Sequence, residues 1–538
     1  MSQTYDFIIT GAGSAGCVLA DRLSANGRFT VLVLEAGGSD RRFWIQVPIG
    51  YGRLYYDKRV NWKYETQADP GIAGRKDYWP RGKVLGGSGS INAMVYIRGQ
   101  REDYEDWVAA GNPGWGYADV LPYFKKSEDN SRGADDYHGA GGPLGVASFT
   151  PHPLVECFFQ AGRELGLADN DDFNGQSQDG VGLYQLTTRG GQRCSTARAF
   201  LRPALRRRNL RLELGAHVTR ILFDGHRATG VEYEQNGRRI QARAGREVIV
   251  SGGAINSPQL LQLSGVGPAA LLKRHGIAVI AEAPGVGRNL QDHLFFPFVY
   301  KTRKPSLNNQ LHAPLGKLWA GMKYVFARRG PLALSINHGG AFVRTRRELS
   351  RPNMQLYFVP ASFTGDAPDG RPLLNPDPFG GIGINVSPCR PTSRGHIEIV
   401  SSDFRDYPAI HPNYLATEFD VQEALEGVRF VRRLAATAAL SALIERELNP
   451  WPQGDSDAEL IARIRQAGRT TYHPIGTCAM GPDPADAVVD RRLRPHGLAG
   501  LRVVDASIMP LMISGNTNAP TIMIAERGAD FILEDHKT

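Results

Sequence analysis

Residues 5–35, YDFIITGAGSAGCVLADRLSANGRFTVLVLE, are the stretch that decides the fold. The apolar run at residues 5–10 is typical of a short buried strand, and residues 30–34 are a second run of the same kind. Between them, small and apolar residues over Ser14–Ser24 favour a helix. The order of strand, glycine turn, helix and strand predicts the first unit of a parallel sheet in an α/β fold.

The turn between strand and helix has the spacing G-x-G-x-x-G. Gly11 allows the tight turn, Gly13 lets the backbone approach a pyrophosphate, and Gly16 lets the helix pack closely on the strand. Free N–H groups at the helix N-terminus attract phosphate, and Glu35, about twenty positions after Gly16, can accept a hydrogen bond from a ribose. An ADP-containing dinucleotide, NAD or FAD, is expected here. The expected contacts are Gly11, Gly13, Ser14, Ala15, Gly16, Glu35 and Ala36.

The composition predicts a globular protein with more than one core. The chain has 538 residues, of which 42% are hydrophobic and 22% charged, and a single core stops growing near about 250–300 residues. Its formal net charge is +9, but the basic clusters are short and acidic residues are interspersed. We therefore expect a solvated surface and no nucleic-acid partner; the oligomeric state stays open.

The same sequence bears on location. Its five cysteines are scattered without a C-x-x-C pair, which favours a reducing compartment and argues against a disulfide framework or a metal site. The sequence has no apolar run of about 18 residues or more, and the first strand begins too early for a secretory signal. We expect a cytoplasmic protein with no transmembrane segment, for which peripheral membrane association stays open.

A second glycine-rich stretch, YWPRGKVLGGSGSINAMVYIRG, covers residues 78–99. Its glycines leave a run of backbone without side-chain bulk, so main-chain N–H groups can touch the phosphate and ring edge of a flat cofactor. A glycine-rich surface turn is the alternative interpretation. The candidate cofactor contacts in this stretch are Arg81, Gly86, Gly87, Ser88, Gly89, Asn92 and Ala93.

The rest of the chain alternates between two kinds of sheet. Strands from Leu210–Leu214 onward are typical of an antiparallel meander, and residues 247–261 return to the parallel sheet. Residues 311–465 alternate as in an antiparallel sheet. The pattern predicts two discontinuous domains. The dinucleotide domain covers 1–155, 196–310 and 466–538, and the substrate domain covers 156–195 and 311–465.

Four stretches, in order along nearly the whole chain, resemble those of the glucose–methanol–choline (GMC) family of FAD-dependent alcohol oxidases and dehydrogenases. They are residues 11–35, 81–99, 245–267 and the pair 472–481 with 504–530. The resemblance implies FAD and not NAD. It also implies a Rossmann-like parallel-sheet domain for FAD and a discontinuous substrate domain built on a large antiparallel sheet.

The resemblance also implies a catalytic pair. His473, in YHPIGTCAMG, matches the family's catalytic histidine, and Asn516 matches its partner. Independently, Pro474 favours an extended segment that leaves the imidazole free to enter a cavity, and histidine accepts protons near neutral pH. An alcohol would give its proton to His473 and its hydride to flavin N5, forming an aldehyde. Further cofactor contacts implied are Val218, Asp505, Ala506 and Asn518.

Two departures from the family refine these expectations. Ile91 stands where some relatives carry a histidine that links FAD covalently, so the FAD is expected to be non-covalent. His338 stands where choline-oxidising members have a glutamate, so His338 is a candidate pocket residue and a neutral primary alcohol the expected substrate. Oxygen or a quinone would accept the electrons. The alternatives are a choline dehydrogenase-like enzyme, a hydroxynitrile-lyase-like member without net redox, and an NAD-binding regulatory module.

Overall fold

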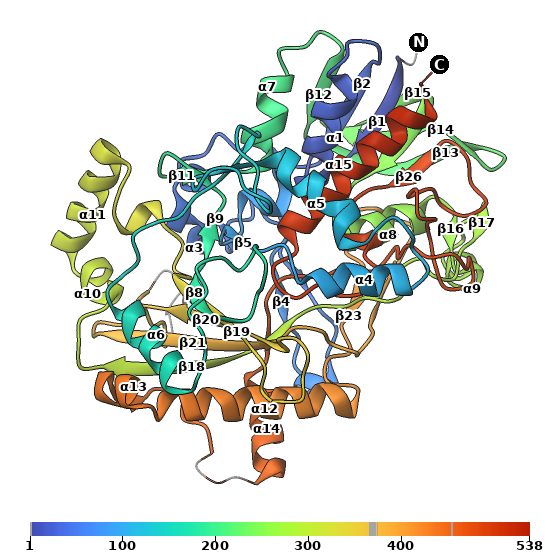
Figure 1. Cartoon of the computed structure of the whole chain (residues 1–538). Helices are drawn as coiled ribbons and strands as arrows, with labels where there is room; N and C mark the ends of the chain where they lie inside the picture. Colours follow the sequence, from blue (N-terminus) through green and yellow to red (C-terminus); the bar gives the residue numbers. More distant parts are fainter. Residues whose placement is uncertain (1–2, 365–372, 374, 453, 455, 538) are drawn as a thin grey trace.

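Two large sheets organise the protein, one in each half of the molecule (Figure 1). The computed structural model describes residues 3–364, 373, 375–452, 454 and 456–537. The domain ranges expected from the sequence also include the few positions outside this set. Parallel strands with covering helices occupy one half and an antiparallel sheet occupies the other, which confirms the mixed α/β fold class.

The first sheet is parallel in its centre and ends in an antiparallel hairpin. Its four parallel pairs join strands from the two ends and the middle of the chain, and the hairpin extends it by two antiparallel strands. The strands are, in spatial order, β12 (Leu210–Leu214), β2 (Val31–Glu35), β1 (Thr4–Thr10), β15 (Arg238–Val250), β14 (Arg227–Gln235) and β13 (Ala216–Asp224), with β26 (Leu501–Val503) also paired to β15.

Helix α1 (Ser14–Ser24) packs so closely on this sheet that glycine is required in the turn before it. A Cβ on Gly16 would lie 1.9 Å from the carbonyl oxygen of Gly11, and Gly11 itself has φ +99°. The C-terminal helix α15 (Asn518–Asp535) runs beside α1 (Figure 1). Arg22 on α1 holds the buried Glu526 of α15 through an ion pair of 2.6 Å, so the two ends of the chain share one core.

Strand β12 was expected in the antiparallel meander, and this expectation is wrong. Leu210 pairs in parallel register with Val31, at the edge of the sheet beside β2. The chain reaches this edge through the helical turn Ala197–Leu201 and α7 (Arg202–Ala204), which pack against α1. A strand's own residues show that it is extended, but packing of the connection decides which neighbour it joins.

The second sheet is antiparallel and is covered by α12 (Glu418–Ala435) on the face away from the first sheet (Figure 1). Every residue of its central strand β20 is buried. The strands are, in spatial order, β24 (Ile444–Glu447), β18 (Leu294–Thr302), β21 (Gly381–Pro388), β20 (Met354–Val359), β19 (Gly339–Val343) and β8 (Gly180–Leu183).

Strand β18 lies in this second sheet, although residues 196–310 were assigned to the dinucleotide domain. Phe296 pairs with Val386, and Leu294 pairs with Thr470 of β25 (Arg469–Thr470). We therefore propose that the domain boundary falls just before Leu294. The alternation of buried and partly exposed residues in β18 is typical of a strand. Its partner strands lie far away along the chain, and no local pattern identifies them.

Candidate active site

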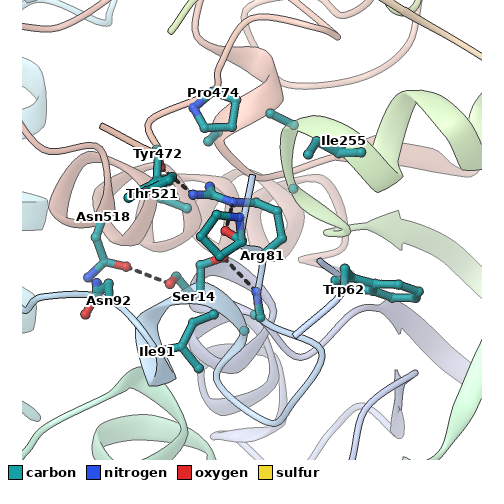
Figure 2. Close-up of a pocket in the computed structure, with 18 of the residues that line it drawn as sticks. Ser14, Trp62, Arg81, Ile91, Asn92, Ile255, Tyr472, Pro474, Asn518 and Thr521 are labelled. Atoms are coloured by element: carbon teal, nitrogen blue, oxygen red, sulfur yellow. Dashed lines mark hydrogen bonds between the residues drawn. The ribbon is translucent and has the colours of Figure 1, made fainter. Parts of the chain in front are cut away.

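One elongated cavity runs between the two halves and collects most of the residues expected to form the site (Figure 2). Its wall contains both glycine-rich stretches, the start of α15 and the segment that carries His473. The expected residues that line it are Gly11, Gly13, Ser14, Ala15, Glu35, Ala36, Arg81, Gly87, Ser88, Asn92, Ala93, Val218, His473, Asp505, Ala506, Asn516 and Asn518.

Three of the expected cofactor contacts, Gly16, Gly86 and Gly89, lie behind this wall. A Cβ on Gly86 would meet Ser90 Oγ at 2.3 Å, and one on Gly89 would meet Ser14 Oγ at 3.0 Å. Together with Gly16, these glycines bring backbone segments close to one another. They do not appear among the described lining residues, so they shape the cavity without forming its surface.

His338, the candidate pocket residue, also lies outside the described wall. Its Nδ1 accepts a hydrogen bond of 3.0 Å from the backbone N–H of His152. Burial lowers its pKa to about 3, with the nearby His152 contributing. Its neighbours Ile336 and Asn337 line the cavity instead, while the hydrogen bond to His152 holds the His338 imidazole outside the described wall.

The glycine end of the cavity fits the diphosphate of a dinucleotide. Gly13 caps α1 with no side-chain bond, so the first N–H groups of the helix face the cavity, and Gly87 comes so near that a Cβ on it would lie 2.7 Å from Gly13 Cα. The buried hydroxyls of Thr10 and Ser251 line the same region and have no partner within the described residues. Buried polar groups normally have partners, and a bound cofactor would supply them.

Glu35 is held in place at the end of β2, in the cavity wall. Its two carboxylate oxygens accept backbone N–H groups from Ala12 at 2.9 Å and Gly37 at 2.7 Å. Burial raises its pKa to about 7, against the opposing effect of these two hydrogen bonds. Each oxygen keeps a lone pair for a ribose hydroxyl.

Helix α15 begins at the cavity. Ser14 Oγ donates a 2.7 Å hydrogen bond to Asn518 Oδ1, which ties the first residue of α1 to the first residue of α15 (Figure 2). Thr517 and Thr521 also line the wall. Because a helix N-terminus carries a partial positive charge, this end favours negative charge on a bound cofactor.

The position of His473 is set by a buried carboxylate. Its backbone N–H donates to Asp292 Oδ1 at 2.7 Å, and Asp292 Oδ2 accepts a 2.6 Å hydrogen bond from the hydroxyl of Thr470. Arg81 donates to the carbonyl of Tyr472 (Figure 2). The turn that carries the imidazole is therefore held from both sides.

A chain of hydrogen bonds defines which nitrogen of His473 carries the proton. His293 Nε2 lies 2.8 Å from the carbonyl oxygen of Cys389, and since a carbonyl only accepts, this nitrogen carries hydrogen. His293 Nδ1 is then a lone pair, 3.1 Å from His473 Nδ1, which donates to it. This leaves His473 Nε2 unprotonated, 3.1 Å from the amide nitrogen of Asn516.

The imidazole of His473 is also kept neutral. Burial lowers its pKa well below the ordinary value of 6.5, and the nearby His293 and Arg81 lower it further. A neutral imidazole with a free Nε2 at a cavity wall is ready to accept a proton. Sequence reasoning found His473 and Asn516 but missed His293 and Asp292, because nothing in the local pattern of either residue marks it.

Around Asn516 the cavity becomes apolar and aromatic. Tyr357 and Tyr51 belong to one buried cluster, against which Tyr55 packs. The only carboxylates in the described wall are Glu35 and Asp505. Asp505 accepts from the N–H of Gly253 and the hydroxyl of Ser257, so it organises the backbone near the glycine turns.

The fold and the cavity together define a class of enzyme. A Rossmann-like glycine turn at one end and a buried, neutral imidazole at the other are the parts of a dinucleotide-dependent oxidoreductase. The chain belongs to the GMC oxidoreductase family, whose N-terminal and C-terminal family models match residues 5–295 and 391–525. It is an FAD-binding enzyme acting on CH–OH donors, which confirms the resemblance seen in the sequence.

Curated relatives match over nearly the whole chain. Mitochondrial choline dehydrogenase from Mus musculus is 45% identical, over 98% of this chain and 89% of its own length. Alcohol dehydrogenase [acceptor] from Pseudomonas putida is 44% identical, over 98% of this chain and 96% of its own length. Among solved structures, pyridoxine 4-oxidase from Mesorbium loti is 32% identical with a TM-score of 0.89, covering 99% of both chains.

Proposed function

We propose that this enzyme oxidises a neutral primary alcohol to the aldehyde, with His473 as the proton acceptor and Asn516 as the residue that orients the substrate. The unprotonated Nε2 of His473, 3.1 Å from the amide nitrogen of Asn516 at the cavity wall, carries this proposal. In place of this direct hydrogen bond, an alcohol oxygen within reach of both groups would receive a hydrogen bond from Asn516 and give its proton to His473. When bound, FAD supplies the acceptor for the hydride at N5.

The cofactor contacts follow from the same cavity. We propose that the residues of the wall named above hold FAD, with Glu35 at the ribose and the start of α1 at the diphosphate. Ile91 lines the cavity and has no nucleophilic atom, which supports non-covalent binding. Acid precipitation should therefore release all of the flavin into the supernatant, and flavin that stays with the pellet would contradict non-covalent binding.

The preference for a neutral substrate rests on charge. The cation Arg81 is half-buried in the cavity wall near His473, where it lowers the histidine's pKa. No carboxylate of the described wall lies on the Asn516 side, since Glu35 and Asp505 hold backbone near the glycine turns. A cationic substrate would be repelled by Arg81 and would find no anionic partner there.

Choline is the second candidate, because curated relatives named choline dehydrogenase match the whole chain. The aromatic rings of Tyr51, Tyr55 and Tyr357 offer faces that could attract a quaternary ammonium group. Which candidate is the substrate therefore depends on whether attraction of the ammonium group to the aromatic faces outweighs its repulsion by Arg81.

Anaerobic stopped flow decides between the candidates. The holoenzyme is mixed with a medium-chain primary alcohol, benzyl alcohol or choline, and the loss of flavin absorbance is followed. We expect the neutral alcohols to bleach the flavin with higher second-order rate constants than choline does. A higher constant for choline would make the enzyme a choline dehydrogenase. Cleavage of a cyanohydrin without bleaching by any alcohol would indicate a hydroxynitrile-lyase-like enzyme. Reoxidation with oxygen or a soluble quinone then identifies the acceptor.

A further inference from the structure

Two helices stand at the edge of the molecule, and the second of them projects away from both sheets (Figure 1). They are α10 (Leu307–His312) and α11 (Pro314–Ala327). Helix α11 is attached through its inner side, where Tyr324 packs in a small cluster with Val47 and Ala333. Its outer side faces solvent and is the subject of the inference.

The outer side of α11 is apolar. Half of the large hydrophobic side chains exposed in the described residues, six of twelve, lie on this one helix. Phe326 is 86% exposed, Leu315 80% and Trp319 65%. We call this surface the α11 face, and its members are Leu315, Leu318, Trp319, Met322, Val325 and Phe326.

The spacing of these residues places them on one stripe. They recur at intervals of three and four residues, which is the period of an α-helix, while Ala320 and Tyr324 occupy the buried opposite side. A helix on a globular surface normally shows water its polar stripe and buries its apolar one. On α11 the apolar stripe points outward, so the pattern suits a surface that is covered by something apolar.

The charges around the α11 face are of one sign. Between His293 and Arg347 the sequence contains no aspartate or glutamate. Within and beside the two helices, the exposed residues include Lys317, Lys323 and the pair Arg328 and Arg329. Within their own segment, the apolar side chains of the α11 face are therefore flanked by basic residues and by no acidic residue.

We propose that the α11 face docks on the surface of an anionic lipid bilayer, with the helix lying in the plane of the interface. Apolar side chains on one face together with flanking lysine and arginine are the features of such interfacial helices. Tryptophan, here Trp319, favours the boundary between headgroups and acyl chains, and basic residues are attracted to anionic lipids. No helix within the described part of the chain is long and apolar enough to cross a membrane.

A second exposed apolar residue stands on the segment against which α11 packs. Phe43 of the short helix α2 (Phe43–Gln46) is 56% exposed, and its ring contacts that of Trp44. Trp44 in turn packs on the cluster beneath α11. Arg41, which precedes Phe43, is exposed. An exposed apolar residue near an exposed basic one therefore also occurs on the segment that holds the inner side of α11.

Vesicle co-sedimentation of the holoenzyme tests this proposal. The two vesicle types are pure phosphatidylcholine and phosphatidylcholine with about 30% phosphatidylglycerol, an anionic lipid. We expect binding to the anionic vesicles that weakens with added salt. The double variant Trp319→Glu/Phe326→Glu should lower the partition coefficient by about tenfold or more, since it replaces apolar area by charge.

The controls keep the result specific. Phe419→Glu changes another exposed aromatic residue, on α12, and should bind vesicles as the wild type does. Flavin content and alcohol oxidation should be unchanged in all variants, because α11 does not line the described cavity wall. Equal binding by the double variant and wild type, or no binding to anionic vesicles, would overturn the proposal. So would a wild-type dimer, seen in size-exclusion chromatography, that the double variant dissociates, because the face would then join two copies of the chain.

Discussion

The two ends of the active-site cavity are built in different ways. The end that we propose to bind the cofactor is made of backbone. Its glycine turns take a shape that a few consecutive residues determine. The end that we propose to be catalytic is made of groups that meet from distant segments, namely the side chains of His473, His293 and Asn516 and the carbonyl of Cys389. Changes at the first end should therefore act on cofactor binding and folding, and changes at the second on rate. Four experiments test this division.

The largest effect is expected from Gly16→Val, which attacks the backbone end. The new Cβ would lie 1.9 Å from the carbonyl oxygen of Gly11, so helix and strand could not keep their spacing, at a cost above the usual 1–3 kcal/mol or so of overpacking. We expect little folded flavoprotein, measured as flavin per protein and as thermal midpoint. Gly245→Ala is the control, because the nearest atom to its Cβ would be 3.5 Å away. Full flavin content in Gly16→Val would show that the turn tolerates a side chain.

Next in size is His473→Ala, at the side-chain end. Flavin content should stay near wild type, while flavin reduction by alcohol slows by about 10²–10⁴ because the general base is lost. Anaerobic stopped flow measures this step without interference from reoxidation. Asn516→Ala should slow the same step less, since the base remains. A His473→Ala rate within about threefold of wild type, below the base-catalysis range, would mean that the proton goes to another group.

A smaller effect is expected from His293→Phe, which tests the hydrogen-bond chain. Without the acceptor Nδ1 of His293, His473 Nδ1 keeps, among its described partners, only the Thr471 hydroxyl at 3.1 Å, which can donate or accept. His473 can then hold its proton on either nitrogen, and reduction should slow by about 10–100-fold, as for other residues that orient a reacting group. His293→Asn restores an acceptor oxygen and should recover part of the rate. If both variants slow reduction equally, His293 serves packing and not orientation.

The smallest effect concerns pH. The pKa of His473 is lowered by burial, so the rate of flavin reduction should stay constant as pH falls through 6.5, the ordinary histidine value. It should fall only when His473 itself is protonated at lower pH. Burial raises the pKa of Asp292 to about 6, so Asp292→Asn separates its contribution. A decline centred near 6.5 that persists in Asp292→Asn would contradict a neutral, shielded imidazole.

The buried histidines make a related prediction for stability. Because the pKa of His473 is lower folded than unfolded, the unfolded chain binds more protons below pH 6.5. The same holds for His293, whose pKa burial lowers to about 4. The contribution of these two histidines to the free energy of unfolding should therefore decrease as pH falls from 6.5 toward 4, while Glu35 and Asp292, whose pKa values burial raises, contribute in the opposite direction. The free energy of unfolding of His293→Phe relative to wild type should therefore rise as pH falls through this range, and a difference that does not change with pH would contradict the lowered pKa of His293.

The sequence by itself determined the strand, glycine turn and helix of residues 5–35, and with them the dinucleotide. This was possible because both signals are local. A position too close to its neighbours for a side chain requires glycine, and a helix that buries one side has a regular apolar pattern, and each can be recognised within a few residues. The same reasoning, helped by the family motif, reached His473 and Asn516. It placed β12 in the wrong part of its sheet and His338 beside a cavity whose described wall it does not join.

Tertiary structure alone decided which strands are neighbours and which side chains meet. The nitrogen of His473 that is free to take a proton depends on His293, 180 residues away, and through it on the carbonyl of Cys389. No residue in that chain carries a local signature, since a hydrogen bond between distant segments exists only after both sheets have formed and fixed the two imidazole rings. The physical reason is that secondary structure is determined largely by neighbours along the chain, whereas the position of a proton on an imidazole is determined by neighbours in space.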